Sequence, residues 1–206
     1  MLKRIFDIFF SSLGLIIFSP IFLLVAISIK IDSVGPVFFR QERIGRDGRV
    51  FKIYKFRTMI NDAEKKGVHF TTPNTDPRIT KIGFFLRRFC IDEIPQLINV
   101  LKGEMSFVGP RPEVPEIVTL YTEDQKKVLS VKPGLTDLAT LEFLKEGGIT
   151  KLSQNLYQTY TQEIMPEKLK LNLKYVNEQS LWLDFKLIIK TIFRIISDIL
   201  RWRKQP

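Results

Sequence analysis

The chain has 206 residues, enough for one domain with its own hydrophobic core beside a membrane anchor. Its formal net charge of +10 indicates anionic partners, such as nucleic acid, acidic lipid headgroups or phosphorylated substrates. The single cysteine, Cys90, and the single histidine, His69, exclude an intrachain disulfide and a histidine-based metal site or catalytic triad within one chain. We interpret Cys90 as a small core residue, because no obvious base accompanies it.

The N-terminal segment from Ile8 to Ile29 carries no charged residue and is long enough to be a transmembrane candidate. A signal peptide would have a shorter apolar core and a small-residue cleavage site, so we expect this segment to stay attached. Ser19-Pro20 lies near its centre. The proline removes one helix hydrogen bond, and the serine hydroxyl can satisfy a backbone carbonyl that the break frees.

Two topologies fit this segment. Each half reaches about one leaflet of a bilayer, so a helical hairpin could enter and leave by one face. Basic residues on both sides suit that hairpin, because positive charge favours the cytoplasmic face. They are Lys3, Arg4, Lys30, Arg40 and Arg43. A kinked helix that spans the membrane is the alternative, which the apolar length alone favours slightly.

A β-hairpin is predicted next. A short strand begins at residues 37–39, Asp47-Gly48 is a hairpin turn signal, and residues 51–56 alternate apolar and basic side chains. Alternation puts Lys55 and Arg57 on one face, either as a phosphate-binding ridge or as a solvated surface. Residues 61–77, which include His69, are predicted to form a polar loop, and residues 79–89 a short amphipathic helix.

An acidic pair, Asp92-Glu93, precedes Pro95 and a helical apolar pattern that stops at Gly103. The helix should begin near residues 92–94, where its dipole and free amide groups favour negative charge. We expect Asp92 to stay ionised there, as a carboxylate nucleophile or metal ligand should. The alternative is that Asp92 only caps the helix.

Arg111 lies between two prolines, so its backbone is restricted and its guanidinium is held by a stiff turn. Such a fork can grip a diphosphate with two hydrogen bonds, or it can pair with a nearby carboxylate such as Glu113. Lys132–Thr136 forms a second turn that either supports the site or connects elements. Residues 180–206 are predicted to form a long basic amphipathic helix, lying in a membrane interface or packed on the domain.

Several motifs in order resemble the bacterial sugar transferase family, also called monotopic phosphoglycosyl transferases, which initiate glycoconjugate assembly. They are RQERIGRDGRVFKIYKFRTM, CIDEIPQLINVLKGEMSFVGPRPEVPE and KPGLTDLA, and the resemblance covers residues 3–140. It implies a re-entrant anchor at residues 1–34 broken at Ser19-Pro20. It also implies a catalytic domain at residues 35–206 on the cytoplasmic face of the bacterial inner membrane. The expected fold is mixed α/β and mainly helical, with a short strand region near residues 36–58.

The resemblance further implies a covalent mechanism. Asp92, helped by Glu93 and Mg²⁺, would take the phospho-sugar from a UDP-sugar and release UMP, and polyprenyl (undecaprenyl) phosphate would then accept it. Lys55, Arg87 and Arg111 match the family's basic positions and would bind the donor phosphates. Asp92 is also the expected Mg²⁺ ligand.

The chain departs from the common pattern at Asp137, which replaces a glycine, and at Thr140, which replaces a glutamine. These changes put the identity of the sugar in doubt more than the reaction. Three rival interpretations stay open: a membrane-tethered basic scaffold, a phosphohydrolase that gives the phospho-sugar to water, and a nucleic-acid-binding protein. No nucleic-acid-binding signature accompanies the basic residues, so we expect no nucleic-acid partner. A homodimer in the membrane is conceivable.

Overall fold

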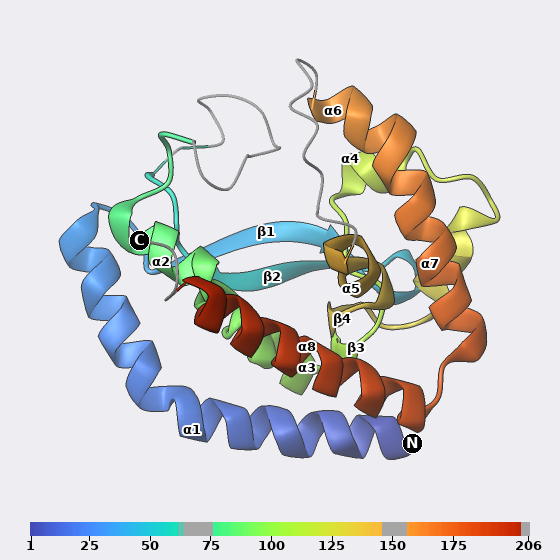
Figure 1. Ribbon diagram of the computed structural model, residues 1–206, viewed down its shortest axis with the longest axis horizontal. Coiled ribbons are helices and arrows are strands. Elements are labelled where there is room, and N and C mark those ends of the chain that lie inside the picture. Colours follow the sequence, from blue (N-terminus) through green and yellow to red (C-terminus); the bar gives the residue numbers. More distant parts are fainter. Residues whose placement is uncertain (62, 64–75, 146–155, 203–206) are drawn as a thin grey trace.

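A long N-terminal helix, α1 (Leu2–Asp32), runs along one side of the molecule and bends in its middle (Figure 1). The computed structural model describes residues 1–202 except 62, 64–75 and 146–155. Pro20 lies inside α1, and the Ser19 hydroxyl donates to the Ile16 carbonyl at 2.8 Å, as predicted for the break. Within the described residues, α1 alone has the length and apolar composition needed to cross a membrane.

The polar face of α1 fixes its first half to the domain. The Arg4 guanidinium donates to two carbonyls in the last turn of helix α3 (Gln96–Lys102), at 2.6 and 2.7 Å. The buried Asp7 carboxylate accepts from the Ser106 hydroxyl at 3.0 Å and the Phe107 amide at 3.2 Å. The helix therefore turns a few polar groups inward and leaves most of its apolar side chains exposed.

The predicted hairpin is confirmed, with longer strands than expected. Strands β1 (Phe38–Ile44) and β2 (Val50–Phe56) pair antiparallel, and the turn between them places Asp47 and Gly48 at positive φ. Arg57 lies beyond the end of β2, where its guanidinium donates to the Ser33 and Val34 carbonyls after α1. The predicted shared ridge of Lys55 and Arg57 is therefore wrong, because Arg57 is buried as an anchor for the end of α1.

Two short helices follow, close to their predicted bounds. Helix α2 (Lys81–Arg88) is capped by the Thr80 hydroxyl, and helix α3 (Gln96–Lys102) ends at Gly103, whose φ of 84° favours glycine. Between them a 3₁₀ turn spans Ile91–Glu93. The acidic pair therefore lies on a separate turn rather than in the first turn of α3. Most of the predicted loop at 61–77, including His69, lies outside the described residues.

A second, parallel strand pair holds the segment around Arg111. Strand β3 (Ser106–Val108) pairs with β4 (Gly134–Thr136), so the Lys132–Thr136 turn supports the site rather than only connecting elements. The Gly109 amide donates to the Thr136 carbonyl at 3.1 Å, and the Gly134 amide donates to the Pro110 carbonyl at 3.0 Å. A Cβ atom on either glycine would lie within 2.2 Å of the facing backbone.

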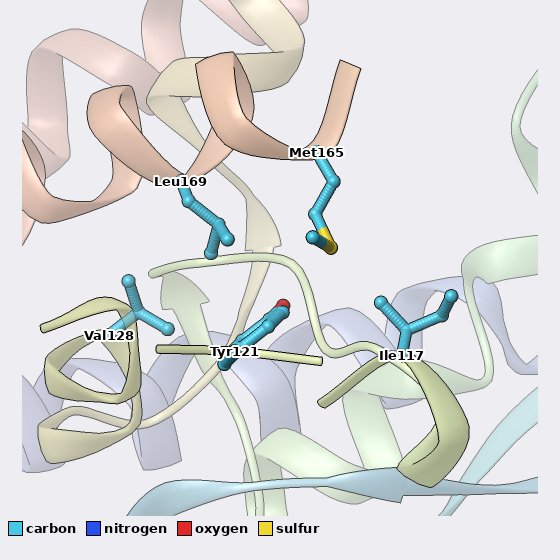
Figure 2. Packing of buried hydrophobic residues seen from close by; sticks show 5 residues of the cluster. All are labelled: Ile117, Tyr121, Val128, Met165 and Leu169. Atoms are coloured by element: carbon cyan, nitrogen blue, oxygen red, sulfur yellow. The ribbon is translucent and has the colours of Figure 1, made fainter. Parts of the chain in front are cut away.

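The C-terminal part covers these strands with helices. After α4 (Pro115–Val118), a 3₁₀ helix (Gln125–Ser130) and α5 (Leu138–Lys145), a continuous helix comprises α6 (Leu156–Thr159), a π-helical segment (Tyr160–Ile164) and α7 (Met165–Glu178). Figure 2 shows Met165 and Leu169 of α7 pointing toward Ile117, Tyr121 and Val128, with which they form a buried cluster.

The last helix, α8 (Leu181–Trp202), has two faces. Asp184 and Leu187 are buried against the domain, while Trp182, Phe185 and Phe193 are more than half exposed. Packing on the domain, one of the two predicted alternatives, is therefore correct for one face. The described chain is mainly helical with two small sheets, as the predicted fold class requires.

Candidate active site

Four segments bring the predicted charged residues together. Lys55 comes from β2, Arg87 from α2, Asp92 and Glu93 from the 3₁₀ turn, and Arg111 from the loop after β3. The Glu93 carboxylate lies at the centre. Its Oε1 accepts from the Lys55 ammonium at 2.8 Å and from the Arg111 guanidinium. Arg111 thus pairs with Glu93, and not with Glu113 as the alternative proposed.

Asp92 is a buried carboxylate, only 8% exposed. Neither the 3₁₀ turn nor α3 has a side-chain cap, so the interpretation of Asp92 as a helix cap is wrong. Burial raises the pKa of Asp92 to about 6, although the nearby Lys55, Arg87 and Arg111 cations oppose this rise. The helix dipole expected to favour the ionised form has little effect here, because α3 begins four residues later and loss of water dominates. Asp92 is therefore ionised at neutral pH but more basic than an ordinary aspartate.

Glu93 has the opposite electrostatic environment. Burial alone would raise its pKa, but the Arg111 and Lys55 cations outweigh burial and hold the pKa of Glu93 at about 2. Two adjacent carboxylates with pKa values pushed apart are the arrangement expected where one acts chemically and the other stays a fixed anion. The geometry suits Asp92 for the chemical role.

Arg87 is held by a residue that no sequence pattern indicated. The Arg87 Nε–H donates to the buried Thr58 hydroxyl at 2.8 Å. Helix α2 lies directly on Thr58, since a Cβ atom added to Gly83 would come within 2.0 Å of the Thr58 carbonyl oxygen. Arg87 and Asp92 are close enough for each charge to shift the pKa of the other.

Arg43 supports the turn that carries Arg111. Its guanidinium donates to the Pro112 carbonyl at 3.0 Å and to Gln41 Oε1 at 2.6 Å, and its buried Nε has no partner among the described residues. Burial lowers the pKa of Arg43, and the Glu113 carboxylate opposes that effect. From the sequence we placed Arg43 only in a basic membrane flank. Its alternation with Gln41 on the inner face of β1 is the signal that could have found it.

Two interpretations of nearby residues change with the structure. Cys90 is exposed and has a φ of 55°, so its interpretation as a core residue is wrong. The two departures from the family pattern are partners: the buried Asp137 carboxylate accepts from the Thr140 amide at 2.5 Å and the Thr140 hydroxyl at 2.7 Å. They cap the start of α5. Glu93 first, and Asp137 more weakly, raise the pKa of Arg111 by their charges.

The donor atoms available for a metal are few. Within the described ranges, no three Asp, Glu, His or Cys side chains group together as a metal cage. Mg²⁺ at phosphoryl-transfer sites is usually held by one or two carboxylates together with substrate phosphates and water. Lys55 and Arg111 both bond to Glu93 Oε1, so a carboxylate ligand for Mg²⁺ would come most readily from Asp92.

A buried carboxylate pair surrounded by three cations is the kind of site that binds and transfers phosphoryl groups, here beside a helix with the length and composition of a membrane segment. The family model described as bacterial sugar transferase matches residues 1–198. The chain therefore belongs to the bacterial sugar transferase family, as its motifs predict.

The chain is also similar to curated proteins with named activities. The chain is 38% identical over 201 residues to the UDP-glucose:undecaprenyl-phosphate glucose-1-phosphate transferase of Escherichia coli, a match that covers 94% of this chain and 40% of the relative. A Caulobacter vibrioides protein of the same name is 36% identical over 206 residues, covering 95% and 70%. The UDP-N-acetylgalactosamine-undecaprenyl-phosphate N-acetylgalactosaminephosphotransferase of Aeromonas hydrophila is 34% identical over 201 residues, covering 95% and 44%. The chain thus spans less than half of two of these three relatives.

Proposed function

We propose that this chain transfers a sugar-1-phosphate from a UDP-sugar to undecaprenyl phosphate, as the first membrane step in the assembly of a glycoconjugate. The main support is the carboxylate pair beside the three cations of the site. The pKa of Asp92 is raised, so it is more basic than an ordinary aspartate, whereas the pKa of Glu93 is lowered, so it stays an anion. The relatives act on different sugars by name, so the proposal leaves the sugar open.

In the first step, an Asp92 carboxylate oxygen attacks the sugar-linked phosphorus of the donor. A new bond forms between that oxygen and phosphorus, the bond from phosphorus to the bridging oxygen of UMP breaks, and UMP leaves with the electron pair. The product is an acyl phosphate that joins Asp92 to the phospho-sugar. A pKa of about 6 supports this role, because the carboxylate is ionised near pH 7 yet more nucleophilic than an ordinary aspartate.

The basic residues bind and orient the donor in this scheme. Lys55 and Arg111 are held in place by Glu93, so they meet the diphosphate from fixed positions. Arg87, on helix α2, is fixed by the Thr58 hydroxyl in the segment that follows β2. Asp92 is the proposed oxygen ligand of Mg²⁺, which when bound would offset the negative charge of the diphosphate.

In the second step, a phosphate oxygen of undecaprenyl phosphate attacks the same phosphorus. The bond between Asp92 and phosphorus breaks, which gives undecaprenyl-diphospho-sugar and restores the Asp92 carboxylate. Two steps allow one small site to serve two anionic substrates in turn. Glu93 stays a carboxylate throughout, since its pKa is about 2.

We propose that α1 is a re-entrant anchor and that residues 35–206 lie on the cytoplasmic face of the inner membrane. Both ends of α1 are tied to the same domain, which supports this topology. Arg4 bonds the start of α1 to α3, and at the other end the Asp32 carboxylate accepts from the Ile82 amide at 2.9 Å. A spanning helix would separate its ends by about 30 Å of hydrocarbon. Exposed aromatic residues on α2 and α8 would lie at the membrane surface.

The proposal is tested by UMP release from a panel of UDP-sugars, with the full chain in nanodiscs, Mg²⁺ and undecaprenyl phosphate. We expect repeated turnover of at least one sugar, beyond one UMP per chain, to require the lipid, and all UMP release to be lost in Asp92→Asn. The control is Asp124→Asn, which changes an exposed aspartate far along the chain from the site. Repeated turnover without the lipid, with many UMP molecules released per chain, would favour a phosphohydrolase. No release from any donor, with normal cellular function of Asp92→Asn, would favour the basic scaffold.

A further inference from the structure

A second charged cluster is centred on Glu113, two residues beyond Arg111 in the sequence. The Glu113 Oε1 accepts from the Tyr160 hydroxyl and from the Lys168 ammonium at 3.2 Å, and Lys168 also donates to the Tyr160 oxygen at 3.1 Å. The side chains of Glu113 and Lys168 are 17% and 18% exposed. The proposed reaction uses none of these three residues, yet the chain holds them in a partly buried network next to its phosphate-binding turn.

The π-helical segment Tyr160–Ile164 places Tyr160 in this network. In a regular α-helix, eight residues make two full turns and about 80° more, so Tyr160 and Lys168 would face different directions. A π turn takes an extra residue per turn and brings the two side chains closer to one face. π segments inside α-helices are frequent at functional sites. Here the π segment redirects Tyr160, whose hydroxyl bonds to Glu113.

Apolar packing fixes α7 to the segment that follows Arg111. Met165 and Leu169 lie on either side of Lys168 along α7, and they pack on Ile117 and Tyr121 (Figure 2). The cluster leaves α7 little freedom to slide relative to this segment. Tyr160 and Lys168 are therefore presented to Glu113 by a rigid support, and not by a surface loop.

The bonds of Glu113 to Tyr160 and Lys168 affect which carboxylate is available to Arg111. Arg111 has two carboxylates within reach of its charge besides Asp137, namely Glu93 and Glu113, and each raises the pKa of Arg111. Of these two carboxylates, Glu93 bonds to Arg111, whereas Glu113 Oε1 bonds to Tyr160 and Lys168. Burial and the Glu113 charge raise the pKa of Tyr160, so its hydroxyl stays a donor. Without the Tyr160 and Lys168 donors, the Glu113 carboxylate would lose both of these hydrogen bonds and would compete with Glu93 for the Arg111 guanidinium.

We propose that Tyr160 and Lys168 are positioning residues that hold Glu113 away from Arg111, and so keep Arg111 on Glu93 and available to the donor diphosphate. This inference rests on the proposed function, which it extends to two residues outside the motifs that the sequence analysis used. In this scheme Tyr160 and Lys168 touch neither donor nor acceptor, and they act through Glu113 and Arg111. Their loss should therefore weaken donor binding and not the folding of the chain.

The test compares Tyr160→Phe and Lys168→Met with Lys170→Met, an exposed lysine of the same helix that pairs with Glu167. Two quantities are measured on the full chain: the dissociation constant of UDP with Mg²⁺ by calorimetry, and KM against kcat for the active donor. We expect each variant at the cluster to weaken UDP binding and raise KM about tenfold, the usual effect of losing one hydrogen bond to a charged group. The control should bind UDP as the wild type does.

A rescue experiment separates positioning from simple destabilisation. Glu113→Gln removes the competing charge but keeps an oxygen that accepts hydrogen bonds. Added to Tyr160→Phe, it should restore UDP affinity to within about twofold of Glu113→Gln alone. Failure of the rescue, or unchanged UDP affinity in both cluster variants, would overturn the inference. A wild-type chain that binds UDP but does not turn over would instead refute the proposed function, and one that binds no UDP would refute both.

Discussion

Asp92→Asn should make the folded protein more stable while it removes activity. The folded state holds Asp92 with a pKa raised from 3.8 to about 6, because the carboxylate is buried. A raised pKa means that the folded chain binds the proton more tightly than the unfolded chain does. The stabilisation from that proton is fully present below about pH 4 and is lost as the pH rises through about 6. At pH 8 the ionised carboxylate is therefore a cost, which the neutral asparagine avoids.

The size of the effect follows from the shift. A change from 3.8 to about 6 is about two pKa units, and each unit corresponds to about 1.4 kcal/mol. The largest gain in unfolding free energy expected at pH 8 is therefore about 3 kcal/mol, and it should be about half as large at pH 5. For a chain of this length, such a gain raises Tm by about 5–10 °C.

Thermal unfolding of the full chain in detergent, without Mg²⁺, measures this effect at pH 5 and pH 8. Glu93→Gln should change Tm in the opposite direction at both pH values, because its pKa of about 2 shows that the ionised form is favoured in the folded state. Asp124→Asn, at an exposed position, should leave Tm nearly unchanged. The reasoning is refuted if Asp92→Asn lowers Tm at pH 8, or if the two variants of the pair shift Tm in the same direction.

Three further outcomes are expected. Turnover should fall about tenfold per pH unit below about pH 6, since protonation of Asp92 removes the nucleophile; an unchanged kcat/KM at pH 5 would contradict this role. Gly83→Ala should lower the unfolding free energy by about 1–3 kcal/mol, measured by thermal unfolding, and should reduce turnover, because its Cβ would meet the Thr58 backbone and displace the helix that carries Arg87. Pro20→Leu should favour a straight α1 that spans the membrane. The test places one cysteine at each end of α1, in a chain without the native cysteine, and labels them with a membrane-impermeant thiol reagent. Both should react from the same side of a vesicle with Pro20 present, and from opposite sides in Pro20→Leu.

The elements that were predicted correctly depend on local chemistry. The β1–β2 hairpin follows from Asp47-Gly48, and the end of α3 follows from Gly103, because both need positive φ within a few residues of a regular pattern. Helix α2 was predicted from a different local signal, the amphipathic spacing of its side chains. The parallel pairing of β3 with β4 has no such local signal, since it joins segments 28 residues apart in the sequence.

The candidate site was only partly accessible from the sequence. The five charged residues were chosen by family resemblance, because residue patterns alone left Lys55 and Arg111 open between substrate binding and ordinary surface roles. The structure brings these residues together. Their electrostatics required the fold: burial sets the pKa of Asp92, and the partner of Arg111 is set by long-range packing. The contact of Arg43 with the Arg111 turn was missed for the same reason.

The covalent step is the central claim, and intact-mass measurement tests it most directly. The full chain is incubated with Mg²⁺ and the active UDP-sugar without undecaprenyl phosphate, quenched in acid and weighed beside Asp92→Asn. We expect the wild-type chain to gain the mass of one phospho-sugar, located on Asp92 by peptide mapping. The gain should be absent from Asp92→Asn and should be removed when the lipid is added. A wild-type chain that releases UMP in a lipid-dependent way, but never gains this mass, would contradict the covalent step.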